Sequence, residues 1–182
     1  MIKRIDDKKS VIFKTTSELI YEQGIQGTPM SQIAQKANVA VGTIYRYFES
    51  KDYLINQLYY DIKTRLLVSM AQNFRPPVHD GVINVLKEIV RFCIKNPADV
   101  SFILQYEYSP LITAATQEKV LSLLDPIANL IIQLIKDEYL KEMPVDVHIN
   151  LIYYTTVSLS RLQLSNTVLE TALESIWDMI KK

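Results

Sequence analysis

Residues that interrupt regular structure are rare in this sequence, since glycine occupies only 4 of its 182 positions and proline only 7. Between these interruptions, apolar residues recur at helical spacing almost throughout the chain. A protein of many short strands needs turn residues at close intervals, so the pattern favours long helices. Hydrophobic residues make up 48% of the chain, enough to bury a sizeable core. We therefore expect an all-α protein.

The expected helices are short near the N-terminus and long afterwards, which predicts a domain of residues 1–50 and a larger helical domain of residues 51–182. Thr28, Ser50 and Asp80 are suitable N-cap residues, and Gly24 suits the C-terminal end of the first helix. Pro126 predicts a kink or a division into two helices. The expected ranges are 6–23, 29–37, 41–48, 51–72, 81–95, 98–108, 116–140, 145–164 and 167–181.

Two of the short helices, over 29–37 and 41–48, are joined by a three-residue turn, as in a helix-turn-helix. At 100° per residue, Val41, Ile44 and Phe48 share one face of the second helix and can pack on the first. The remaining side chains then form an exposed ridge on the opposite face: Gly42, Thr43, Tyr45, Arg46 and Tyr47.

This ridge has the chemistry expected of a surface that enters the major groove of DNA. The Arg46 guanidinium can donate two hydrogen bonds to the O6/N7 edge of guanine. Gly42 allows close approach of the backbone. Threonine and tyrosine hydroxyls can contact phosphates, and the tyrosine rings can contact sugars or thymine methyl groups.

The distribution of charge also indicates an anionic partner for the N-terminal domain. Residues 1–51 contain eight Lys or Arg against five Asp or Glu, so their net charge is 8 − 5 = +3, and the rest of the chain carries −3. Lys51 lies in the first turn of a helix, where the helix dipole disfavours a cation. A phosphate bound at that helix N-terminus would reverse the penalty. The alternative is that the neighbouring Asp52 offsets it within the chain.

The stretch GIQGTPMSQIAQKANVAVGTIYRYFESKDYLI resembles the DNA-binding domain of the TetR family of transcriptional repressors. The similarity extends in detail over about residues 8–55. It rests on a capped short helix, a turn, an aromatic recognition helix and the start of the following helix. The matching residues are Ile33-Ala34, Val39, Gly42, Ile44-Tyr45, Tyr47-Phe48 and Lys51-Asp52-Tyr53-Leu54.

The resemblance implies a ligand-responsive regulator, a repressor, that binds a palindromic operator as a homodimer. It implies that Val41, Gly42, Tyr45 and Arg46 lie next to the bases. It also implies phosphate contacts from Ser31, Thr43, Tyr47 and Lys51, with the Lys3-Arg4 arm reaching the DNA backbone.

Three residues depart from the family pattern. Asn38 replaces the usual turn glycine, and asparagine tolerates the left-handed conformation next best. Ala40 stands where a capping serine is common. Val41 is apolar where polar residues often read bases, so it suits a thymine methyl group.

The resemblance also implies that the larger domain binds an effector and forms the dimer. Aromatic and polar residues that could line a small-molecule pocket are Cys93, Phe102, Gln105, Tyr106, Tyr108, Tyr153 and Tyr154. By the resemblance, the last two helices pack across a two-fold axis through Ile152, Thr156, Leu159, Leu169, Ala172 and Ile176. The alternative for both sets is that they simply fill the core of one chain.

Catalytic and metal sites find little support in the sequence. His79, expected in a Pro-rich loop, and His148, at a helix start, form no recognised metal spacing with Cys93. Phosphate loops, nucleophile elbows and paired-histidine motifs are not found. The interpretation is a non-enzyme without cofactor or metal.

One cysteine, no evident signal peptide and no apolar stretch of membrane-spanning length favour a cytoplasmic protein. Two other functions stay open. One is a ligand-independent DNA-binding protein. The other is a small-molecule-binding module or enzyme that retains the N-terminal helices.

Overall fold

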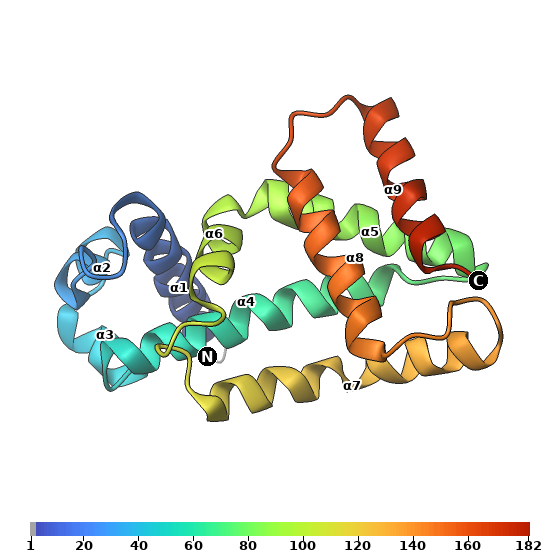
Figure 1. Cartoon of the computed structure of the whole chain (residues 1–182). Helices are drawn as coiled ribbons and strands as arrows, with labels where there is room; N and C mark the ends of the chain where they lie inside the picture. Colours follow the sequence, from blue (N-terminus) through green and yellow to red (C-terminus); the bar gives the residue numbers. More distant parts are fainter. Residues whose placement is uncertain (1–2) are drawn as a thin grey trace. The chain divides into compact units, whose positions relative to one another are not determined.

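The computed structural model describes the backbone of residues 3–182 and the side chains of residues 8–182, so the Lys3 and Arg4 side chains lie outside the described residues. The described chain is all-α, as predicted, and forms nine helices and no strand (Figure 1). Their bounds are α1 Lys3–Gln23, α2 Met30–Lys36, α3 Val41–Tyr47, α4 Lys51–Asn73, α5 Val78–Lys95, α6 Pro97–Tyr106, α7 Ala114–Lys136, α8 Val145–Ser160 and α9 Asn166–Ile180.

Helix ends follow local hydrogen bonding, which confirms some expected caps and corrects others. The Ser50 hydroxyl accepts a hydrogen bond from the backbone N–H of Tyr53 at 3.0 Å, so Ser50 caps α4 as predicted. The predicted Thr28 cap is wrong: its hydroxyl donates to the Gly24 carbonyl at 2.8 Å, and Pro29 occupies the N-cap position of α2. Thr28 therefore closes the turn after α1 instead of opening α2.

Two expectations for the long helices also need correction. Asp80 is not an N-cap, because α5 already begins at Val78 and the Gly81 N–H bonds the Pro77 carbonyl at 2.9 Å. Asp80 and its neighbour His79 lie in the first turn of α5. Pro126 does not divide α7, which continues as one helix from Ala114 to Lys136.

By contact, the chain falls into two compact units. Unit 1 consists of the chain up to Lys63 together with Asn96–Lys119, and unit 2 consists of Thr64–Lys95 and Val120–Lys182. Unit 1 therefore contains α6 as well as the N-terminal helices. The functional division expected at residue 50 stays a prediction.

Unit 1 buries an apolar core in which α1 packs against α2 and α6, and α2 against α3. A polar network fastens the segment after α6 to α4. The Asn56 amide donates to the Leu111 carbonyl and accepts from the Thr113 N–H, both at 2.9 Å. Farther along α4, Lys63 forms an ion pair with Glu107, and the two side chains are only 11% and 13% exposed.

Tyr59 completes this network, because its hydroxyl lies 3.3 Å from a carboxylate oxygen of Glu107. Burial raises the pKa of Tyr59, and the negative charge of Glu107 raises it further. Tyr59 therefore stays a neutral hydrogen-bond donor to Glu107.

Unit 2 is built on α5, which packs against both α8 and α9. Its core joins side chains of α5, α7 and α9 with Leu140. The C-terminal end is held by the loop after α7, where the Lys141 N–H bonds the Ile180 carbonyl at 2.9 Å. Among the described helices, none combines the length and the apolar character that a membrane crossing requires.

Candidate nucleic-acid interface

The turn between α2 and α3 has the geometry that its sequence predicts. Asn38 has a φ of 54°, which confirms the expected left-handed conformation. The following residue, Val39, donates its N–H to the Ala34 carbonyl at 3.0 Å. Asparagine thus performs the role of a turn glycine, because its short polar side chain tolerates this conformation.

The inner face of α3 anchors it to the rest of unit 1. Ile44 and Phe48 are fully buried, as expected. The Phe48 ring centroid lies 5.3 Å from that of Phe13 in α1. The Lys9 ammonium lies over both rings, 5.3 Å from the Phe13 centroid and 6.0 Å from the Phe48 centroid. These contacts fix the orientation of α3 on α1.

The outer face of α3 is an exposed ridge, as predicted. Tyr45 is 51% exposed, Arg46 and Gly42 are exposed, and Thr43 and Tyr47 are partly exposed. A Cβ added to Gly42 would meet no atom within 4 Å, so its backbone faces open space. The ridge can therefore approach a partner closely.

Val41 differs from the other two residues of the predicted apolar face, since it is 42% exposed. It is the first residue of α3, so no preceding turn of the same helix covers it. An exposed methyl surface at this position suits the thymine contact expected from the sequence.

Around the ridge, polar contacts hold α2 on α1. Ser31 is exposed at the start of α2. Lys36 forms an ion pair with Glu22 at 2.9 Å, and the Gln23 side chain donates to both the Gly27 carbonyl and Gln32 at 2.7 Å. The two helices are thus joined at both ends of α2.

Lys51 has a contact that sequence reasoning missed. Its ammonium donates to the backbone carbonyl of Ile25, which lies in the turn after α1. Lys51 therefore fastens the start of α4 to that turn, and its remaining N–H groups are available to a phosphate. The contact could not be found from the sequence, because any residue supplies a carbonyl.

The residues expected to bind a ligand are divided between the two units. Unit 1 holds Phe102, Gln105, Tyr106 and Tyr108, and unit 2 holds Cys93, Tyr153 and Tyr154. Phe102 is buried with its ring centroid 5.3 Å from that of Tyr106, whereas Gln105 is exposed and Tyr108 is 81% exposed.

In unit 2, the Tyr153 and Tyr154 ring centroids lie 5.0 Å apart. Cys93 is buried, and burial raises the pKa of its thiol. A raised pKa keeps the sulfur protonated and unreactive at neutral pH. The ligand role of all seven residues stays a prediction.

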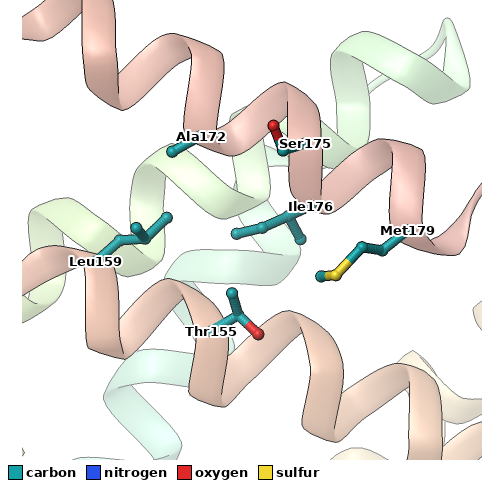
Figure 2. Close-up of a pocket in the computed structure, with 6 residues that line it drawn as sticks. All are labelled: Thr155, Leu159, Ala172, Ser175, Ile176 and Met179. Atoms are coloured by element: carbon teal, nitrogen blue, oxygen red, sulfur yellow. The ribbon is translucent and has the colours of Figure 1, made fainter.

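An apolar groove of about 310 Å³ lies between α8 and α9 (Figure 2). Three of the residues predicted at the dimer interface, Leu159, Ala172 and Ile176, line it. Figure 2 shows the Ile176 side chain reaching from α9 toward α8. The sequence did not predict the other three lining residues, Thr155, Ser175 and Met179. The first two of these are small and polar.

The remaining predicted dimer residues differ in exposure. Ile152 and Leu169 are partly exposed, but Thr156 is fully buried and its hydroxyl donates to the Ile152 carbonyl at 2.6 Å. Its own chain covers Thr156, and Ile176 is only 2% exposed. The dimer role of all six residues stays a prediction.

The N-terminal helices are similar in sequence to those of known bacterial regulatory proteins. Residues 12–58 match the family model of bacterial regulatory proteins of the tetR family. An HTH-type transcriptional regulator of Haemophilus influenzae is 32% identical over 106 residues, which are 57% of this chain and 57% of the relative. An HTH-type regulator of Staphylococcus aureus is 34% identical over 102 residues, 50% of this chain and 51% of the relative. The chain thus spans little more than half the length of these relatives.

Solved structures extend the similarity over the whole chain. A TetR-family transcriptional regulator of Haemophilus influenzae is 26% identical, with a TM-score of 0.85, and the match covers 98% of this chain and 99% of that one. A TetR-family regulator of Marinobacter aquaeolei has the same fold, with a TM-score of 0.91 over 100% of both chains at 18% identity. All four of these proteins are described as regulators of transcription and none as an enzyme.

Proposed function

Because the chain belongs to the TetR family of bacterial regulatory proteins, we propose that it represses transcription as a ligand-responsive homodimer bound to a palindromic operator. The observation that carries this proposal is the two-sided recognition helix α3. Ile44 and Phe48 are fully buried beneath it, while its opposite face presents an arginine and two tyrosines. A rigidly anchored helix with an exposed polar ridge suits the major groove.

Within this proposal, some residues of α3 and its surroundings contact the bases and others contact the phosphates. Arg46 reads a guanine, and Val41, Gly42 and Tyr45 lie against neighbouring bases. The four phosphate contacts come from side chains around the ridge and fix its position on the duplex. They are Ser31, Thr43, Tyr47 and Lys51.

The apolar groove between α8 and α9 supports the homodimer. A second copy related by two-fold symmetry can cover the same groove on each chain, as isologous dimers do. Two recognition helices must lie about 34–36 Å apart to reach successive half-sites on one side of the duplex. An effector that binds better to another arrangement of the body would move the dimer away from that spacing and release the DNA.

Replacing Arg46 with alanine should cost about 1–3 kcal/mol of binding free energy at one base position. The loss comes from a bidentate contact to guanine, so the variant should accept the other bases there almost equally. Fluorescence titration with an operator selected from a random library, and with its single-base variants, measures this. An unchanged base preference would show that Arg46 does not contact the bases.

Replacing Lys51 with alanine should weaken binding to all sequences and lower the salt slope of log K by about 1. The variant should also unfold more easily, by about 1 kcal/mol, because the bond to the Ile25 carbonyl is lost. Titrations at several salt concentrations and urea unfolding separate the two effects. Lys36→Ala, which breaks an exposed ion pair with Glu22, is the matched control. A fall in stability with the salt slope unchanged would leave Lys51 a structural role only.

A further inference from the structure

A histidine of α5 contacts two carboxylates, one on its own helix and one on α9. His79, in the first turn of α5, has its Nδ1 atom 2.9 Å from a carboxylate oxygen of Asp80. Its Nε2 atom lies 2.9 Å from a carboxylate oxygen of Glu174 in α9. The ring also meets the Trp177 ring edge-on, with 5.7 Å between centroids. Two residues of α9 therefore hold one imidazole of α5.

This geometry depends on the protonation of the ring. A neutral imidazole has one N–H, so it can donate to only one carboxylate, and its other nitrogen would face an oxygen with a lone pair. An imidazolium has two N–H groups and can donate to both. We propose that His79 is a proton-dependent clasp, which holds α9 against α5 when its ring is protonated and weakens when the proton is lost.

The charged groups that face His79 support this proposal. They are Asp80 on its own helix and Glu174 on α9. Together they raise the pKa of His79, the hydrogen bond to Glu174 most strongly and that to Asp80 next, against a smaller opposing effect of burial. The N-terminal end of α5 disfavours a cation, and the two carboxylates act against that effect.

The helix that the clasp contacts, α9, also lines the groove between α8 and α9. Glu174 immediately precedes Ser175 and Ile176, which line that groove. A second ion pair, Lys87 with Glu170 at 2.8 Å, also joins α5 to α9. Lysine–carboxylate pairs ordinarily keep their charges between pH 6 and pH 9. Of the two contacts between α5 and α9, we therefore expect only that of His79 with Glu174 to change in strength between pH 6 and pH 9.

The direction of the pH effect follows from the raised pKa. Below about pH 6.5, histidine is protonated in both the folded and the unfolded chain, so the stabilising contribution of the clasp is complete. It is lost as the pH rises through the higher pKa of the folded state. Acidification should therefore tighten the attachment of α9, and alkaline conditions should loosen it.

Thermal unfolding of the wild type and of His79→Gln at pH 6 and pH 9 tests the clasp. The variant should melt about 2–4 °C below the wild type at pH 6, the size expected for one surface contact in a chain of this length. At pH 9 the difference should be clearly smaller, because a neutral ring can donate only one of the two hydrogen bonds. Glu170→Gln, which breaks the Lys87 pair, should lower the melting temperature equally at both pH values.

Proton NMR adds a direct readout, since the chain has only two histidines and His79→Gln assigns their resonances. The His79 ring should titrate above about 6.5, and Glu174→Gln should lower its midpoint. A midpoint at about 6.5, or an equal effect of His79→Gln at pH 6 and pH 9, would overturn the proposal. The measurements need neither DNA nor an effector, so their outcome is independent of the proposed function.

Discussion

Replacing Glu107 with alanine should lower the free energy of unfolding by about 3–5 kcal/mol, the typical loss when one partner of a buried ion pair is removed. Glu107 and Lys63 are both almost fully shielded from water. The alanine removes the carboxylate that faces the Lys63 ammonium and also the acceptor of the Tyr59 hydroxyl. Urea unfolding followed by circular dichroism measures the loss.

A double variant, Lys63→Met with Glu107→Leu, is the control for this experiment. Apolar residues of similar volume often replace a buried pair without loss, so the double variant should recover most of the stability. It should also retain DNA binding if the pair serves only to fasten the segment after α6 to α4. A loss below about 1 kcal/mol for Glu107→Ala would show that water screens the pair in solution.

Replacing Phe48 with alanine should lower the free energy of unfolding by about 3–5 kcal/mol, because it leaves a cavity under α3. The ring is fully buried and contacts Phe13, Tyr47 and Tyr53. Loss of this anchor should also abolish specific DNA binding, since α3 is only Val41–Tyr47 and too short to hold its orientation alone. Unfolding curves and operator titrations on the same sample measure both effects.

Tyr45→Ala is the matched control, because Tyr45 lies one turn or less from Phe48 but is 51% exposed. Its loss should leave the unfolding free energy within about 0.5 kcal/mol of the wild type while weakening DNA binding. If Tyr45→Ala and Phe48→Ala destabilised the chain equally, the division of α3 into an anchoring face and a reading face would be wrong.

Much of the fold could be predicted because it depends on local rules. Helical periodicity predicted the helices to within a few residues, and the buried and exposed faces of α3 follow from a rotation of 100° per residue. Asn38 adopts the left-handed conformation because few other residues can replace glycine there. These properties need only neighbouring residues.

The errors have a different physical origin. Thr28 looked like an N-cap, but its hydroxyl finds the Gly24 carbonyl instead. Asp80 looked like a cap, but its carboxylate bonds His79, which also contacts α9 far along the chain. The partners of Thr28 and Asp80 are close in sequence, but the residue type alone does not decide which of several nearby groups the side chain bonds. Only the contact of His79 with Glu174 depends on residues that folding brings together.

The assignment of α6 to unit 1 is likewise invisible in the sequence. Nothing in Pro97–Tyr106 marks it as a partner of α1, and the ties at Asn56 and Lys63 join residues about fifty positions apart. Composition likewise gives no sign that the seven residues expected to bind a ligand belong to different units. The contacts that separate them are long-range, so no local pattern encodes them.

The discontinuity of unit 1 bears on how the protein is made. A ribosome delivers Asn96–Lys119 only after Thr64–Lys95, which belong to the other unit. A nascent chain that ends before Asn96 therefore leaves uncovered the surface of α1 that α6 later packs against. Domains commonly fold from the N-terminus as they emerge, but this N-terminal unit must wait for a segment synthesised much later. Until that segment is synthesised, α1, which contacts α2, lacks its packing partner α6.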